Sequence, residues 1–217
     1  MEMRKARASG AMCVRVRTLV VALVAAVALG LSGCAQPDAP AGDGSRQEPP
    51  DEENSTPSVE WTADGVITAG EYSGEMDKGT YLLYWSRLDD TVHMGIEAET
   101  EGWVAVGIQP GNAMQDADII IGFVADAQVT VEDHYSTGRF GPHKPDTEQG
   151  GTNDILAFGG KEADGVTVIE FSRKLDTGDE YDNPLTAGAT NAVIWAYGTA
   201  DNTSLQHAPR GYGEIAL

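Results

Sequence analysis

From residue 59 onward the chain consists of short apolar runs rich in Val, Ile, Tyr and Trp, separated by Gly, Asp, Asn and Pro. No helical period of useful length interrupts this pattern. A strand needs only a few residues, whereas a helix must repeat its apolar face over several turns, so the pattern predicts an all-β domain. Many short strands favour a β-sandwich over an open sheet, which would leave long unprotected edges.

Alternation supports several of the expected strands. In the run 91–98, Val92, Met94, Ile96 and Ala98 share one face, as the two-residue period of a half-buried strand requires. Strands are expected at 81–87, 91–98, 103–108, 118–124, 129–135, 154–158, 166–172 and 192–197, and near 214–217.

The N-terminus has the pattern of a bacterial lipoprotein signal peptide, residues 1–33. Basic residues precede an apolar run at 19–29 that is too short to span a bilayer. Leu31-Ser32-Gly33-Cys34 then resembles a lipobox, in which the cysteine is acylated. The alternative is an ordinary secretory signal with a chance cysteine, and either interpretation places the domain outside the cytoplasm. We expect a lipid at Cys34 to anchor the protein to the bacterial cell membrane or outer membrane.

Residues 34–58 are expected to form a tether between this anchor and a single domain at 59–217. From 35 to 57 no aliphatic side chain is larger than alanine, so nothing there can build a core. Cys13 would leave with the signal peptide and Cys34 would carry the lipid, which leaves no disulfide for the mature domain.

The mature chain is strongly acidic. Removal of residues 1–33 takes five of the 14 basic residues but one of the 34 acidic residues, which leaves a net charge of −24. This charge opposes binding to nucleic acid and to anionic headgroups. We therefore expect no nucleic-acid partner, and contact with the membrane through the lipid anchor alone.

Met114 is the best clue to function. It lies in a polar loop, 109–117, between two expected strands, where a thioether is either weakly packed or holds something that prefers a soft sulfur ligand. His207, in another polar loop far downstream, is its candidate partner. Taken singly, each is ordinarily a surface or gap-filling residue.

A series of sequence phrases extends from residue 61 to 217, and its order carries more information than any one phrase. The phrases are Asp64-Gly65-Val66-Ile67, Gly70-Glu71-Tyr72, Gly102-Trp103-Val104-Ala105-Val106-Gly107, Ala117-Asp118-Ile119-Ile120-Ile121-Gly122, Val131-Glu132-Asp133-His134-Tyr135-Ser136, Phe171-Ser172-Arg173-Lys174-Leu175-Asp176-Thr177-Gly178-Asp179, Ile194-Trp195-Ala196-Tyr197-Gly198, and His207 with Arg210-Gly211. In this order they resemble the DOMON family. The resemblance implies an immunoglobulin-like β-sandwich of about ten strands with a ligand pocket at one end.

The resemblance also implies a cofactor. In the b-type cytochrome members, haem lies between a Met from the loop after the glycine-rich strand and a His near the C-terminal end, and Met114 and His207 occupy these places here. It therefore implies haem b held without covalent attachment, and the chain has no Cys-x-x-Cys-His motif for such a link. Met/His ligation raises the reduction potential and fills both axial positions, which suits electron transfer, so no catalytic residue is assigned. Arg210 could pair with a haem propionate or brace a turn at 211–213.

The surroundings of the haem are less defined. Candidate apolar walls are Trp103, Val106, Ile108, Ile120 and Phe123, of which strand parity allows only some to face a pocket. A second group, which comprises Asp133, His134, His143, Asp146 and Glu148, is expected to be a solvated acidic loop, with a calcium or transition-metal site as the alternative.

Two functions remain open. The first is an anchored haem b protein that exchanges electrons with a separate redox partner. The second is a haem-free module that binds a sugar or another small ligand by stacking on Trp85, Trp103 or Trp195.

Overall fold

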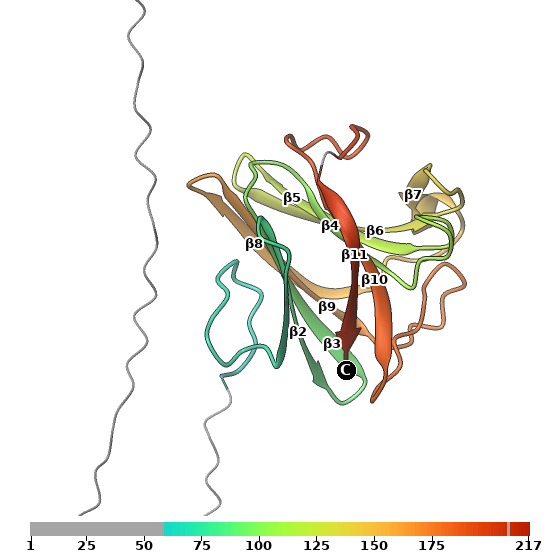
Figure 1. Cartoon of the computed structure of the whole chain (residues 1–217), viewed down its shortest axis with the longest axis horizontal. Coiled ribbons are helices and arrows are strands. Elements are labelled where there is room, and N and C mark those ends of the chain that lie inside the picture. Colours follow the sequence, from blue (N-terminus) through green and yellow to red (C-terminus); the bar gives the residue numbers. More distant parts are fainter. Residues whose placement is uncertain (1–58, 208) are drawn as a thin grey trace, which may run out of the picture. The chain divides into compact units, whose positions relative to one another are not determined.

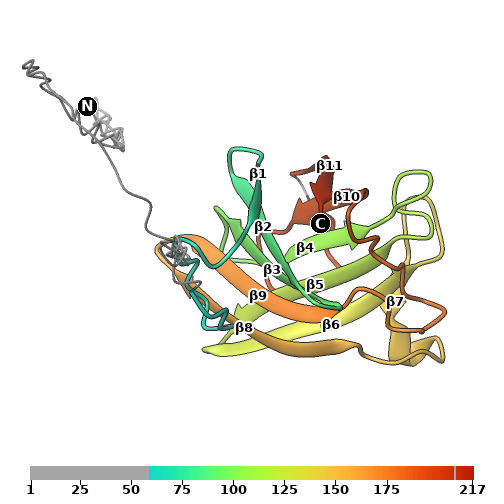
Figure 2. The same ribbon diagram turned by 90° about the horizontal axis from the view of Figure 1, so that it is seen from below.

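The computed structural model describes residues 59–207 and 209–217, which form two antiparallel β-sheets packed face to face (Figure 1 and Figure 2). The predicted all-β sandwich is therefore confirmed. The signal peptide, Cys34 and the tether lie outside the described residues. The strands are β1 (Gly74–Asp77), β2 (Tyr81–Leu88), β3 (Thr91–Ala98), β4 (Val104–Ile108), β5 (Asp118–Ala125), β6 (Gln128–Ser136), β7 (His143–Pro145), β8 (Ile155–Ala163), β9 (Val166–Lys174), β10 (Thr190–Tyr197) and β11 (Arg210–Ala216).

One sheet has the order β1-β2-β3-β9-β8 and the other the order β11-β10-β4-β5-β6-β7. Figure 1 shows β10 and β11, in red, on one side of the six-stranded sheet and β7, in yellow, on the other. The main core fills the space between the sheets. Its members include Leu83, Met94, Ile96, Val106, Ile108, Ile120, Ile169 and Phe171.

Three elements differ from the sequence expectation. Strands β1 and β7 were not expected, because neither has an apolar run. Their backbones are fixed by pairing with β2 and β6. Strand β11 begins at Arg210, so residues 211–213 pair with β10 and do not form the turn that was one of the two alternatives for the role of Arg210.

The central strands β4, β5 and β10 of the six-stranded sheet carry apolar residues on both faces. All five residues of β4 are buried, because Val104, Val106 and Ile108 face the main core while Ala105 and Gly107 face the opposite side. This outer face has its own apolar cluster. The cluster comprises Trp103, Ala105, Ala117, Ile119 and Ile121, with Met114, Phe123, Ile194 and Ala196 packed against it.

Among residues 59–207 and 209–217, we find no helix with the length and apolar character needed to cross a membrane.

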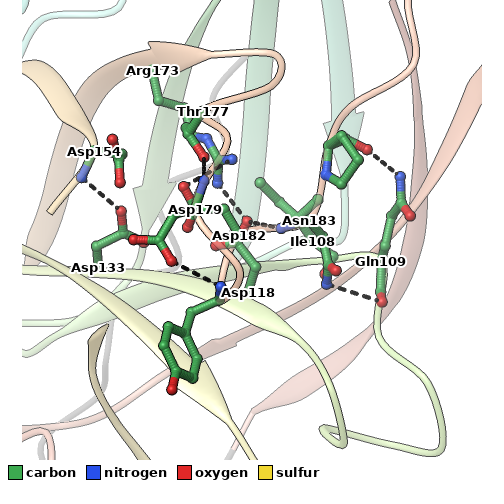
Figure 3. A network of polar contacts seen from close by, with 12 residues as sticks. Ile108, Gln109, Asp118, Asp133, Asp154, Arg173, Thr177, Asp179, Asp182 and Asn183 are labelled. Carbon is green, nitrogen blue, oxygen red and sulfur yellow. Dashed lines mark hydrogen bonds and ion pairs between the residues drawn. The ribbon is translucent and has the colours of Figure 1, made fainter. Parts of the chain in front are cut away.

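A buried charge network connects the two sheets (Figure 3). Arg173 of β9 is fully buried, and its Nη1 donates to Asp118 Oδ2 at the start of β5. Its Nη2 lies 3.5 Å from Asp182 Oδ2, in the loop that follows β9. Pairing is needed here because an isolated buried charge costs several kcal/mol. The Arg173 pairs therefore hold the loop after β9 against the six-stranded sheet.

Asn183 extends this network to the loop that carries Met114. Its backbone N–H donates to Asp118 Oδ2 at 3.0 Å. Its side-chain Nδ2 donates to the carbonyls of Ile108 at 3.0 Å and Asp116 at 2.7 Å. These two carbonyls lie at opposite ends of the loop 109–117, so Asn183 fixes the span of the loop and the position of Met114 within it.

Further carboxyl groups surround Asp118, and burial changes their acidity. Burial raises the pKa of Asp133 to about 8, with a further contribution from the neighbouring charges of Asp118 and Asp182. Burial is also the main cause that raises the pKa of Asp146 to about 7. Both groups therefore hold protons in the folded protein at pH values where the unfolded chain is ionised.

Replacement of Arg173 tests the role of the buried ion pairs. We expect Arg173→Met to lower the free energy of unfolding by about 3–5 kcal/mol, because Asp118 and Asp182 would stay buried without their cation. Chemical denaturation measures this loss. Lys174→Met is the matched control, since Lys174 is half exposed and lies 3.9 Å from Asp90, and it should cost less than about 1 kcal/mol. Equal losses in the two variants would contradict the assigned role.

The raised pKa of Asp133 predicts a dependence of stability on pH. Between the ordinary aspartate pKa of about 4 and the folded-state pKa of about 8, the folded protein binds more protons than the unfolded chain, so stability falls as pH rises. We expect Asp133→Asn to reduce the fall between pH 5 and 8 by roughly 1–3 kcal/mol, measured by urea denaturation in EDTA. Asp164→Asn, in an exposed turn, should keep the wild-type slope. An unchanged slope in Asp133→Asn would refute the assignment.

Candidate functional site

A cavity of about 1000 Å³ lies over the outer face of the six-stranded sheet. Cofactor and small-molecule pockets typically measure about 300–1,000 Å³, so this one is large enough for a sizeable ligand. Residues from the strands and from three loops line it. Among them are Trp103, Ala105, Met114, Ile119, Ile121, His134, Arg139, Phe140, His143, Ile194, His207, Arg210 and Tyr212.

The floor of the cavity is apolar. Ala105 and Gly107 of β4, Ile119 and Ile121 of β5, and Ile194 of β10 all face it because alternate residues of a strand share one face. At Gly107 a Cβ atom would lie 2.6 Å from Ile194 Cγ1, so the neighbouring side chain fills the space that a larger residue would need. The glycine at position 107 thus makes room for Ile194 to pack over β4.

Met114 reaches the cavity from the loop between β4 and β5. Its backbone N–H donates to the carbonyl of Arg139 at 3.2 Å, and its carbonyl accepts from Ala117 N at 3.1 Å. Ala113, which precedes it, has a left-handed φ of 60°, so the chain turns sharply at this point. The Met114 side chain is half-buried and packs against the outer apolar cluster. The sulfur-bearing side chain is therefore ordered by packing, although the loop around it is polar.

His207 reaches the same cavity from the loop between β10 and β11. Its ring lies edge to face with the Trp103 indole, at 6.1 Å between centroids and 83° between planes. Trp103 is itself fixed against Gly198, where a Cβ atom would lie 2.3 Å from the indole Nε1. The Trp103 side chain therefore gives a rigid support for one edge of the imidazole.

The imidazole of His207 has the protonation state that metal binding needs. Burial, aided by the positive charge of Arg210, lowers its pKa, so the ring is neutral at neutral pH. Its Nδ1 is buried and has no hydrogen-bond partner in any other described residue. A buried polar atom without a partner costs free energy, which a ligand or bound water in the cavity would recover.

A second pair of histidines lies at the β6 and β7 side of the cavity. His134 Nδ1 and His143 Nδ1 are 3.1 Å apart, and His134 Nε2 lies 3.0 Å from Glu132 Oε2. Burial is the main cause that lowers the pKa of both rings, in His143 to about 4. The neighbouring His207 contributes to the shift in His143, so the three rings share one electrostatic environment.

The expected solvated acidic loop is therefore wrong for most of its members. Asp133 and Asp146 are buried, at 3% and 0% exposure, and belong to the network around Asp118. His134 and His143 line the cavity, and Glu148 alone is both exposed and at its edge. The group divides because adjacent residues of β6 point to opposite faces, so Asp133 turns inward and His134 outward.

The structure brings together the main site residues expected from the sequence but not all of the expected walls. Met114, His207 and Arg210 line one cavity, as does Trp103. In contrast, Val106, Ile108 and Ile120 lie in the main core, and Phe123 packs against the outer cluster.

The three candidate tryptophans also differ in position. Trp85 is in the core, where its Nε1 donates to the carbonyl of Ala216 at 2.8 Å, so it is not available to a ligand in this cavity. Trp195 stacks on Tyr81 with 4.8 Å between ring centroids and also contributes to the lining.

Sequence reasoning missed the small and branched residues of the floor and the aromatic Phe140 at the rim. The floor could have been predicted from the alternation of residues along β4, where the small Ala105 and Gly107 alternate with larger core residues. Phe140 is 79% exposed and lies outside the strands, so the alternation of residues along a strand could not predict its position.

Comparison with known proteins shows the family of the chain. A family model for the DOMON domain matches residues 77–198, which is more than half of the chain. The DBH-like monooxygenase protein 1 of Mus musculus is 34% identical over 120 residues, and that of Homo sapiens 33% identical over 120 residues. Each match covers 55% of this chain and 19% of the relative, so this chain spans about a fifth of the length of these proteins.

Solved structures show the same fold. The cytochrome b domain of pyranose dehydrogenase from Coprinopsis cinerea superposes with a TM-score of 0.50 at 13% identity, over 66% of this chain and 80% of that one. The cytochrome domain of Myriococcum thermophilum cellobiose dehydrogenase gives a TM-score of 0.52 at 11% identity, over 66% and 81%. The family model, which matches more than half of the chain, shows that the chain belongs to the DOMON domain family.

Proposed function

We propose that this domain binds haem b without covalent attachment, with Met114 and His207 as axial ligands, and that it transfers electrons outside the cytoplasm. The observation that carries the proposal is the convergence of the two side chains. They belong to loops about 90 residues apart in sequence, yet both line one cavity over an apolar sheet face. The cytochrome domains with the same fold support the choice of cofactor.

The residues present fit this group on three grounds. The floor is apolar, as a ligand with an apolar face requires. The imidazole of His207 is neutral because burial lowers its pKa, and its Nδ1 has no hydrogen-bond partner in any other described residue, which leaves this nitrogen available to a ligand. Two guanidinium groups, of Arg139 and Arg210, lie among the lining residues, where they suit the carboxylates of a haem edge.

Bound haem b would supply one-electron redox chemistry at its iron. The chain's own residues set the conditions for it. With haem bound, the thioether of Met114 would favour the reduced iron and raise the potential, and the imidazole of His207 would supply the second protein ligand. With both positions filled, the site suits exchange of electrons with a separate redox protein better than reaction with a substrate. A lipid at Cys34 would keep this exchange at a membrane surface.

A haem-free module that binds a sugar is the second candidate. The observation in its favour is the pair of aromatic rings at the cavity, because Phe140 is 79% and Tyr212 68% exposed. Exposed aromatic rings beside a pocket are suited to stacking on sugar rings. A full-length protein that refuses hemin and binds a glycan on screening would favour this candidate over the first.

Replacement of each axial ligand tests the haem proposal. In the full-length wild-type chain with added hemin, we expect a low-spin absorption spectrum in both oxidation states. Met114→Leu and His207→Gln each remove one ligand, so each should give a high-spin spectrum. Met114→His keeps six ligands but replaces sulfur with nitrogen, so it should lower the reduction potential by an amount on the order of 100 mV.

The matched controls are Met94→Leu and His93→Gln, because both residues lie on β3 and do not line the cavity. They should keep the wild-type spectrum. If Met114→Leu and His207→Gln also keep it, then other residues hold the iron and the assignment is wrong.

Arg210 is expected to contribute to affinity but not to iron ligation. Because its side chain is exposed, a pairing with a haem carboxylate is worth at most about 1 kcal/mol. Arg210→Gln should therefore weaken hemin binding about two- to fivefold in a titration and leave the low-spin spectrum unchanged. Arg87→Gln, an exposed arginine of β2 outside the cavity, should have no effect. Equal hemin affinity in the two variants would show that Arg210 does not contribute to hemin binding.

A further inference from the structure

The pair of histidines at the β6 and β7 side of the cavity has a geometry that its role as cavity lining does not require. In the antiparallel register His134 lies opposite Pro145, and His143 lies opposite Ser136, so the two histidines are diagonal neighbours on one face. Their side chains meet with ring centroids 5.2 Å apart and with Nδ1 facing Nδ1 at 3.1 Å. Two imidazole nitrogens that bind one tetrahedral ion at about 2.0–2.1 Å lie roughly 3.3 Å apart, which is close to this separation.

The hydrogen bond of His134 to Glu132 fixes which nitrogen is available. A carboxylate can only accept, so the 3.0 Å contact requires that Nε2 of His134 carries the hydrogen. Nδ1 of His134 then has a free lone pair, and this lone pair points at Nδ1 of His143. A carboxylate behind one nitrogen of a histidine whose other nitrogen binds an ion is the usual support of a metal ligand, because it fixes the tautomer and raises basicity.

We propose that His134 and His143 bind one divalent transition-metal ion of the zinc and copper class through their Nδ1 atoms, with Glu132 as the positioning residue. Imidazole donors select this class over calcium and magnesium, which prefer oxygen. Within the described residues no third His, Cys, Asp or Glu offers a ligand atom close to both nitrogens. The remaining coordination positions are therefore open to the cavity, where solvent or a small anion can bind.

Binding requires a change of tautomer but no net release of a proton. Without the ion, Nδ1–H of His143 donates to Nδ1 of His134, since two facing lone pairs would repel. With the ion, both lone pairs bind the metal, and the hydrogen of His143 moves from Nδ1 to Nε2. His143 therefore carries its hydrogen on Nδ1 in the hydrogen-bonded pair and on Nε2 when the ion is bound.

The first experiment is a calorimetric titration of Zn²⁺ into the full-length chain, without an affinity tag and without hemin. Excess Ca²⁺ is present to saturate sites made of oxygen ligands. We expect wild type and His93→Gln to bind one equivalent of Zn²⁺. His134→Gln and His143→Gln should each weaken this binding at least tenfold. The absence of binding by wild type, or affinity unchanged in both variants, would overturn the proposal.

The second experiment needs no variant and so does not depend on whether a variant folds. Nitrogen-15 NMR of the wild-type full-length chain reports which ring nitrogen of His143 carries the hydrogen. We expect Zn²⁺ to move it from Nδ1 to Nε2, while the rings of His93 and His207 keep their signals. An unchanged tautomer of His143 at saturating Zn²⁺ would refute the site. Because hemin is absent from both experiments, their result is independent of whether Met114 and His207 bind haem.

Discussion

The apolar character of both faces of β4, β5 and β10, in the middle of the six-stranded sheet, is the constraint on which the rest of the structure depends. In a two-layer sandwich each sheet needs only one apolar face, and the other is ordinarily polar and in contact with water. Here Ala105, Ile119 and Ile121 form a second apolar surface on the outside. The loops that carry Met114 and His207 line a cavity over this surface, and its apolar floor is suited to a ligand with an apolar face.

Strand β6 separates two different chemical environments. Its inward side contributes Asp133 to the buried network in which Arg173 offsets the charge of Asp118. Its outward side contributes His134 to the cavity. The inner network also fixes the loop of Met114 through Asn183, so the charge buried between the sheets and the position of a proposed iron ligand outside them are connected by a few hydrogen bonds.

Much of the fold follows from local pattern, whereas the site depends on contacts that are distant in sequence. The alternation of Val92, Met94 and Ile96 is sufficient to predict β3 and its inner face. The same reasoning is ambiguous in β4, because both of its faces are buried, and this is why Val106 and Ile108 were among the expected cavity walls.

Strand β7 has no run of apolar residues, and pairing with β6 places it. No local signal could therefore bring His143 to His134, nor could a local signal bury Asp146. For Met114 and His207, neither spacing nor composition indicated a common cavity. That expectation came from the resemblance of the ordered sequence phrases to a family, and the structure adds the apolar floor and the support of His207 by Trp103.

The most direct test of the central claim is the set of atoms bound to iron. X-ray absorption at the iron edge of the full-length chain loaded with hemin counts the nitrogen and sulfur neighbours of the metal. Ligation by Met114 and His207 predicts five nitrogen neighbours, four from the porphyrin and one from the imidazole, together with one sulfur. A shell of nitrogen and oxygen without sulfur, or a protein that takes up no hemin, would contradict the proposed haem site.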